Sequence, residues 1–227
     1  MGRLVDQILG SASGLVGSKL VFRNNVSANI IAKRPKKRTS PPSAAELAFR
    51  AKFALAGKVA RAINSIAILK GVWPHNSKGL SKFNEIFQAN YKLINSVANF
   101  GTVNVAPAFG FGTANPVVTA DATSVHLVTD PLGVNVGIDT SVEKIVVAVG
   151  IVVLLTPIAE GTPATSVIAF KTLQGNLDLI NNVDLTANLS GSELTMYESY
   201  TDRKVFACLL TVDDSGKAVR FSSTVHS

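Results

Sequence analysis

The residues of this 227-residue chain that could carry chemistry are few, and most of them are cations. His75, His126 and His226 are isolated, and no HxH, HExxH or CxxC spacing brings metal ligands together. The single cysteine, Cys208, lies in the apolar run VFACLL, which excludes an internal disulfide and predicts a buried, unreactive thiol. No glycine-rich phosphate loop and no serine nucleophile elbow is present. We therefore expect no enzyme, no cofactor, no metal site and no small-molecule substrate.

The chemistry that remains is the binding of anions. Nine cations form the candidate polyanion- or partner-binding site: Lys33, Arg34, Lys36, Lys37, Arg38, Arg50, Lys52, Lys58 and Arg61. The first five lie within six residues and repel one another unless an anion neutralises them. No aromatic residue interleaves this run, so a nucleic acid would be held through its phosphates, without regard to sequence. The last four lie on a predicted helix, where a merely solvated polar face is the alternative interpretation.

Charge is divided unequally along the chain. Residues 1–100 carry sixteen Lys and Arg against three Asp and Glu, a net charge of +13. Residues 101–227 carry six against twelve, a net charge of −6. Such asymmetry suits either a half that faces nucleic acid or head-to-tail packing of unlike surfaces.

The elements that must position these cations begin with a β-hairpin. Polar and apolar residues alternate over residues 19–23, which predicts a half-buried strand. Asn24-Asn25 is a turn pair, and residues 27–33 are predicted to form the returning strand. Pro35 cannot donate to a ladder, so the sheet should end there.

Two helices are predicted after this hairpin. Ser43 and Glu46 have capping-box spacing, and a stripe of apolar residues from Leu47 to Ile68 predicts a helix over residues 44–69. Ser81 predicts the start of a second helix, to about Val97, which should pack antiparallel to the first. Trp73, the only tryptophan, is expected to be a packing anchor in the connection.

Six short motifs in this part of the chain resemble a known family: Ser13-Gly14, Val16-Gly17, Arg34-Pro35, Arg50-Ala51-Lys52-Phe53, Ser81-Lys82-Phe83-Asn84 and Asn90-Tyr91-Lys92. Over residues 10–95 the chain is similar to a family of uncharacterised proteins found mainly in Bacteroidota, with an SGxVG hairpin, an RP-rich turn and an RxKF helix. Phe22 stands where that family has a tryptophan. The resemblance implies the same hairpin and helices before a β-rich domain, and an association with phage-like and surface-assembly genes; it implies no activity.

The composition changes after residue 98. Residues 99–112 are rich in Gly, Phe and Pro, and are predicted to form a linker or an irregular strand edge. Seven strands are predicted beyond it: Val117–Ala120, Val125–Thr129, Lys144–Leu155, Ser166–Thr172, Leu194–Tyr200, Arg203–Val212 and Ala218–Val225. Asp214-Ser215-Gly216 has the composition of a hairpin turn. Because strands and turns alternate, we predict an antiparallel sandwich that is Ig-like or jelly-roll-like.

Residues 145–155 form the most apolar run. Eleven residues fall short of the roughly 20 that a membrane-spanning helix needs. Since the run is rich in β-branched residues, it predicts a central strand buried on both faces, with a strand at a subunit interface as the alternative.

These features predict an α+β chain in three parts. An N-terminal hairpin and an antiparallel helix pair occupy residues 1–98, a linker occupies 99–112, and an antiparallel β-sandwich occupies 113–227. No secretory signal is visible after Met1, so the expected location is a virion or the cytoplasm, with no membrane span.

Two classes of non-enzyme fit this organisation. The first is a self-assembling structural protein, such as a capsid- or tail-type subunit of a virion or virus-like particle. It would be a homo-oligomer whose basic N-terminal region contacts nucleic acid or a neighbouring subunit. The second is a cytoplasmic accessory protein that binds nucleic acid through its phosphates, independently of sequence.

Overall fold

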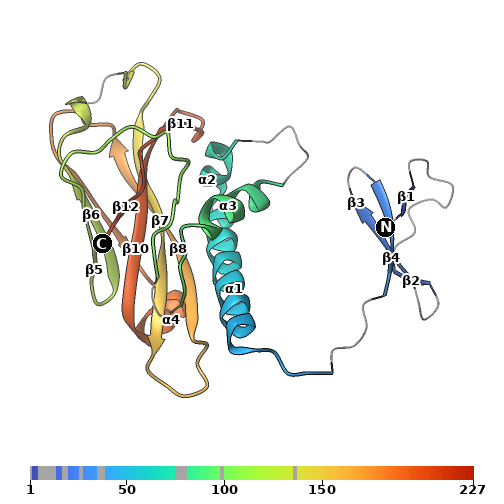
Figure 1. The fold of residues 1–227 in the computed structure, drawn as a ribbon. Helices are drawn as coiled ribbons and strands as arrows, with labels where there is room; N and C mark the ends of the chain where they lie inside the picture. Colours follow the sequence, from blue (N-terminus) through green and yellow to red (C-terminus); the bar gives the residue numbers. More distant parts are fainter. Residues whose placement is uncertain are drawn as a thin grey trace. The chain divides into compact units, whose positions relative to one another are not determined.

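Figure 1 shows a computed structural model of the chain, which describes residues 2–4, 14–16, 20–25, 28–34, 39–74, 81–97, 100–134 and 137–227. The described residues form two compact units, one up to Ala44 and one from Ala45 onward. Both contain antiparallel sheets, and the second adds helices, so the α+β class is confirmed.

The first unit is a four-stranded antiparallel sheet in the order β1-β4-β3-β2. Its strands are β1 (Gly2–Leu4), β2 (Gly14–Val16), β3 (Leu20–Asn25) and β4 (Ala28–Lys33). Asn24 pairs with Asn29 and Asn25 with Ala28, so the predicted turn pair lies within β3. The connection at residues 26–27 lies outside the described residues. β4 ends at Lys33, as the proline two residues later predicts.

The second unit opens with two helices where one was predicted. α1 (Ala44–Ser65) begins at the predicted residue, but Ile66 is extended (φ −79°, ψ 104°), and α2 (Ala67–Val72) follows it. The Ser65 hydroxyl donates to the Ala62 carbonyl at 2.7 Å. A serine that bonds to its own backbone competes with the helical ladder, and here this occurs where α1 ends.

The third helix, α3 (Lys82–Tyr91), is shorter than predicted and runs antiparallel to α1. Ser81 caps it by accepting from the Asn84 amide at 3.4 Å. Ring contacts give the direction: Phe49 lies 6.3 Å from Tyr91, and Phe53 lies 4.9 Å from Phe87, measured between ring centroids.

The remaining elements form two sheets and a short helix. Their bounds are β5 (Val117–Ala120), β6 (Ser124–Thr129), β7 (Ile145–Pro157), β8 (Thr165–Asn176), β9 (Val183–Asn188), α4 (Gly191–Glu198), β10 (Tyr200–Val212), β11 (Ala218–Phe221) and β12 (Val225–His226), with a 3-10 turn at Leu132–Val134. The larger sheet has the order β11-β10-β7-β8, with β12 also paired to β10, and the smaller has the order β5-β6-β9. All of these pairs are antiparallel.

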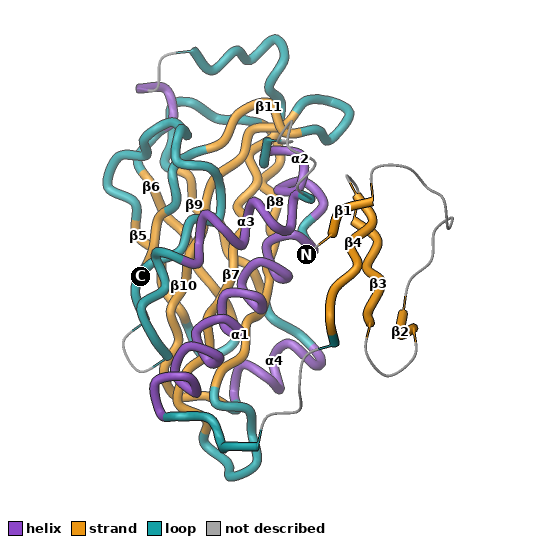
Figure 2. Tube along the Cα trace, turned by 45° about the vertical axis from the view of Figure 1, so that its right-hand side comes forward, coloured by secondary structure: helices purple, strands orange, loops and turns teal. Residues whose placement is uncertain are grey.

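β7 is the central strand of the larger sheet and is buried on both faces, as predicted. Val147, Val149 and Ile151 belong to a core shared with the helices. Val146 and Ala148 belong to a second core, shared with the smaller sheet. Figures 1 and 2 show the three layers that result: α1–α3, the larger sheet, and β5, β6 and β9.

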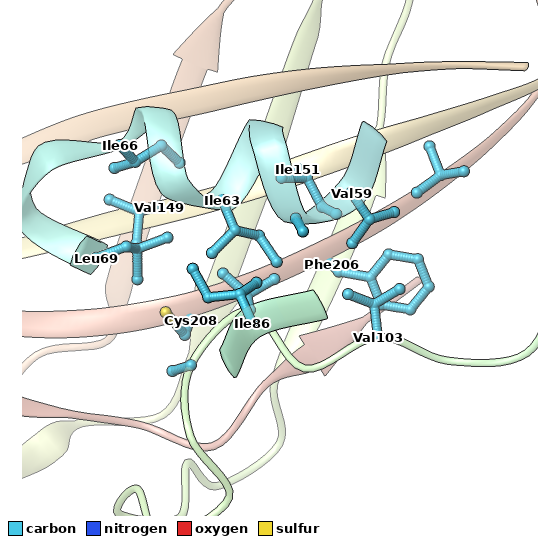
Figure 3. Close-up of a cluster of buried hydrophobic side chains, with 14 of the residues drawn as sticks. Val59, Ile63, Ile66, Leu69, Ile86, Val103, Val149, Ile151, Phe206 and Cys208 are labelled. Carbon is cyan, nitrogen blue, oxygen red and sulfur yellow. The ribbon is translucent and has the colours of Figure 1, made fainter. Parts of the chain in front are cut away.

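The core between the helices and the larger sheet is drawn in Figure 3. Val59 and Ile63 of α1 and Ile86 of α3 pack with Ile151 of β7 and Phe206 of β10, and each is at most 3% exposed. Fully burying such a side chain contributes about 1.5–3 kcal/mol. Because the helices need the sheet to bury these residues, the second unit begins at Ala45, whereas the sequence predicted a sandwich starting at residue 113.

Three strand predictions differ from the structure. The predicted strand Ala218–Val225 is divided into β11 and β12. Residues 194–200, predicted as a strand, fall largely in α4, whose first turn is set by Glu193 and Leu194 amides bonded to the Ser190 carbonyl. β9 adds a strand beyond the seven predicted, although Val183, Leu185 and Ala187 alternate with exposed residues as a half-buried strand should. The β10–β11 hairpin is confirmed, with Gly216 at φ +78° in its turn.

Residues 100–112 are an irregular edge rather than a linker. Phe100, Val103 and Val105 are buried in the helix-side core. The Trp73 indole donates to the Val105 carbonyl at 3.1 Å, so the predicted anchor is confirmed. Phe111 then pairs with the end of β11, its amide bonded to the Phe221 carbonyl at 2.9 Å.

Candidate interaction surface

The nine predicted cations fall into two sets. Lys33, at the end of β4, and Arg34 are exposed in the first unit. Lys36, Lys37 and Arg38 lie outside the described residues. The other four cations lie on α1, in the second unit.

The four cations of α1 make different contacts and do not form one continuous cationic surface. Arg50 pairs with Glu46 at 2.7 Å, an exposed i,i+4 contact of small energetic value. Lys52 places its ammonium 4.8 Å from the centre of the Tyr91 ring, a cation–π contact. Lys58 donates to the Thr165 carbonyl at 2.6 Å and so ties α1 to β8, an edge strand.

Arg61 differs from the other three. It is exposed, and no hydrogen bond or ion pair joins it to another residue in the described part of the chain. Of the four α1 cations, Arg61 is therefore the one whose charge has no partner among the described residues.

Aromatic and aliphatic side chains cover the N-terminal half of α1. Leu47, Phe49 and Phe53 were predicted to belong to the core stripe, but they are 52%, 58% and 53% exposed. The buried stripe begins only at Leu55, because the helix lies on the sheet from there on. We call Phe49 and Phe53, with the neighbouring rings of Phe87 and Tyr91, the aromatic face, whereas Leu47 lies on another side of α1.

A groove lies next to this face, between α1 and α3. Its volume is about 500 Å³, and its lining includes Phe53, Gly57 and Arg61 of α1 and Phe83 and Phe87 of α3. Gly57 is in the helix interior, where glycine costs about 0.5–1 kcal/mol relative to alanine. A Cβ atom added to Gly57 would meet no atom within 4 Å. No packing among the described residues requires this glycine, and its missing side chain keeps the groove open.

The connection between β8 and β9 presents one aliphatic side chain to solvent. Ile180 is 83% exposed. Asp178 accepts from the Ile180 amide at 2.8 Å, from the Asn181 amide at 3.2 Å and from the Asn181 side chain at 2.7 Å. These bonds hold the pKa of Asp178 below its usual value. The Leu179 carbonyl accepts from the Gly133 amide at 3.0 Å, which fixes the turn on the body of the unit. We call residues 178–181 the Asp178 turn.

Glu143 is a buried carboxylate whose role could not be predicted from the residues around it. It is 1% exposed and accepts from the Arg220 Nε at 2.9 Å, from the Asp139 amide at 3.0 Å and from the Thr211 hydroxyl. Arg220 is separated from it by 77 positions, so no local motif marks the pair. These contacts join the ends of β7, β10 and β11, and we assign Glu143 a role in stabilising the fold.

The residues considered for reaction chemistry are dispersed. Burial raises the pKa of the Cys208 thiol, and the side chain is fully buried, as predicted. His126 lies 2.6 Å from an Asp184 carboxylate oxygen across β6 and β9, an exposed pair. Within the described residues, no three His, Cys, Asp or Glu side chains are grouped as a metal would require. None of the described helices has the length and hydrophobicity of a membrane span.

Sequence signals for the groove and the turn existed but were not specific. A glycine inside a helical pattern, as at Gly57, indicates a packing or functional reason without saying which. The run Asp178-Leu179-Ile180-Asn181 has turn composition, but only the fold shows which of its two aliphatic residues points to solvent.

The chain matches no protein-family model. Comparison with curated proteins and with solved structures gives no match either.

Proposed function

We propose that this chain is a non-enzymatic structural protein that assembles with further copies of itself, as a capsid- or tail-type subunit of a virion or virus-like particle does. The observation that carries the proposal is the aromatic face. Phe49 and Phe53 are each more than half exposed although they are large and lie one turn apart on the same side of one helix. Contiguous apolar surface of this kind marks interaction sites, because leaving it in water is costly.

The charge division supports contacts between unlike surfaces. A half with a net charge of +13 and a half with a net charge of −6 favour head-to-tail packing, in which the basic part of one copy meets the acidic part of another. In this proposal the exposed Lys33 and Arg34 contact a neighbouring subunit or encapsidated nucleic acid.

The finer architecture belongs to the same proposal. The two stacked sheets would act as an Ig-like or jelly-roll-like sandwich that supplies a stiff shell element. The resemblance to the Bacteroidota family, with its association with phage-like and surface-assembly genes, supports this role, and the expected location is a virion or the cytoplasm.

Light scattering after size-exclusion chromatography, with negative-stain microscopy, tests the proposal. We expect concentration-dependent particles at low salt, before and after nuclease treatment. Phe49→Ser should reduce the assembled fraction, whereas Val117→Ser, at an equally exposed position on β5, should not. A monodisperse monomer at high concentration and low salt would overturn the proposal.

The second candidate is a cytoplasmic protein that binds nucleic acid without regard to sequence. The exposed Lys33 and Arg34, at the start of a run that continues with Lys36, Lys37 and Arg38, favour it. Its signature in the same experiment is a particle that disappears on nuclease treatment.

A further inference from the structure

We infer that the groove over Gly57 is a socket for the Asp178 turn of a second copy of this chain. Ile180 of one copy enters the groove between the Phe53 and Phe83 rings of the next, and the Asp178 carboxylate faces Arg61 at its rim. This inference rests on the proposed self-assembly and names the two surfaces that make the contact.

The socket has three features that the isolated chain leaves unexplained. Gly57 weakens the helix without relieving any contact, since a Cβ there meets nothing. The groove is walled by Phe53, Phe83 and Phe87, which suits an apolar side chain. Arg61 adds a charge with no described partner, which suits a carboxylate next to that side chain.

The Asp178 turn is the complementary shape. Ile180 is the most exposed aliphatic side chain among the described residues, at 83%. Its backbone is already fixed by the bonds to Asp178 and by the Leu179–Gly133 contact, so docking would order little that is not ordered already. Because the pKa of Asp178 is lowered, its carboxylate is charged at neutral pH.

Charge together with a fixed carboxylate favours this occupant over the other exposed apolar residues. Ile158 is 63% exposed and has Glu160 two positions away, but no hydrogen bond within the described residues fixes the Glu160 carboxylate. Phe109 is 91% exposed, but residues 107–112 contain no carboxylate to face Arg61. The segment Lys33–Arg38 of a neighbour would bring like charges together at the rim. The Asp178 turn offers an exposed aliphatic residue and a fixed carboxylate two positions apart.

The two surfaces are different, so the contact is heterologous. The groove lies on the helix layer, and the turn connects the larger sheet to the smaller one. A pair of copies therefore keeps one free socket and one free turn, and further copies add until a ring closes or a filament grows.

Two variants test the contact without disturbing the fold. Gly57→Leu fills the groove with a better helix former, so its melting temperature should equal or exceed that of the wild type while association weakens by about tenfold or more. Ile180→Asp should weaken association to the same degree, because it replaces the apolar side chain that enters the groove with a charged one. The fold should not change, because the Ile180 side chain is exposed. Gly71→Ala, at a helical glycine outside the groove whose added Cβ also meets nothing within 4 Å, is the matched control and should assemble like the wild type.

Mixing the two variants gives the decisive measurement. Gly57→Leu retains the turn and Ile180→Asp retains the socket, so each alone should associate more weakly than the wild type, and an equimolar mixture should form a 1:1 heterodimer by light scattering at a concentration where neither variant associates alone. If both variants assemble like the wild type while Phe49→Ser does not, the groove contact is wrong but the proposed self-assembly stands. If nuclease disperses the wild-type particles, the groove is not a protein socket. A wild-type monomer would overturn both proposals.

Discussion

Asn90 and Asn104 are joined by two hydrogen bonds that attach α3 to the irregular segment after it. The Asn104 amide donates to the Asn90 side-chain oxygen at 2.7 Å, and the Asn90 side-chain nitrogen donates to the Asn104 carbonyl at 3.1 Å. The same nitrogen donates to the Ile86 carbonyl at 3.0 Å, and Asn90 is fully buried. One side chain thus supplies the pairing that a neighbouring strand would otherwise give, and it fixes the segment over the core.

Asn90→Leu should lower the free energy of unfolding by about 2 kcal/mol, because the Asn104 amide and carbonyl lose their partners while the volume stays similar. Urea denaturation measures this. Gln88→Ala, at an exposed position of the same helix, is the control and should stay within about 0.5 kcal/mol of the wild type. An equally stable Asn90→Leu variant would show that water replaces these bonds at no cost.

Gly150→Ala should destabilise the larger sheet by about 1–3 kcal/mol, the usual cost of overpacking a core. A Cβ on Gly150 would lie 2.3 Å from the Phe206 carbonyl oxygen and 2.6 Å from the Phe170 ring. The measurement is a thermal melt. Gly71→Ala, in α2, adds a Cβ with nothing within 4 Å and should be neutral or stabilising, so a loss of stability in both variants would refute the steric explanation.

Acid should weaken the β10–β11 hairpin. Asp213 accepts from the Ser215 hydroxyl at 2.6 Å, the Ser215 amide at 2.9 Å and the Lys217 amide at 3.0 Å. These bonds lower its pKa below 3.8, with the Ser215 hydroxyl as the largest cause. The pKa of Asp213 is lower in the folded chain than in the unfolded chain. The stabilisation is therefore complete above the pKa of the unfolded chain and is lost as the pH falls through the pKa of the folded chain.

Asp213→Asn should therefore reduce the drop in melting temperature between about pH 4 and pH 2, because an amide does not titrate there. The neighbouring Asp214→Asn is the control, since Asp214 makes none of these three bonds. Equal acid sensitivity of Asp213→Asn and the wild type would exclude this linkage.

Salt dependence tests the cationic segment. If about five phosphates are neutralised, binding to duplex DNA should fall with a log–log salt slope near −4 to −5. Replacing Lys36, Lys37 and Arg38 with Ala should reduce the slope by roughly three and leave the fold intact. Binding that does not depend on salt, or a triple mutant that binds equally well, would assign these cations to a protein interface, and the mutant should then lose assembly.

Local signals predicted many of the elements. A continuous run of β-branched apolar residues located β7, Ser81 located the start of α3, and Asp214-Ser215-Gly216 located the last hairpin. Each of these signals depends on residues that are close in sequence, so the local pattern is enough to predict the element.

The features that could not be predicted depend on contacts between residues that are far apart in the sequence. An apolar stripe predicts that α1 packs against something, but not that the sheet stops covering it before Leu55, which leaves Phe49 and Phe53 exposed. The extent of the second unit was hidden for the same reason, because the helices share a core with strands more than 50 residues away in the sequence. The groove over Gly57 requires two helices to be placed before it exists at all.

Because Cys208 is buried, the rate at which a thiol reagent modifies it measures how often the core around it opens. The thiol lies on β10 beneath the helix layer, with its pKa raised, so the reactive thiolate is scarce while the layers stay closed (Figure 3). A thiol reagent can modify it only in molecules that have opened there. With one cysteine in the sequence, every modification event counts one such opening. Comparing the labelling rates of free and assembled protein therefore shows how far neighbouring copies slow the local opening of a subunit, and no engineered cysteine is needed.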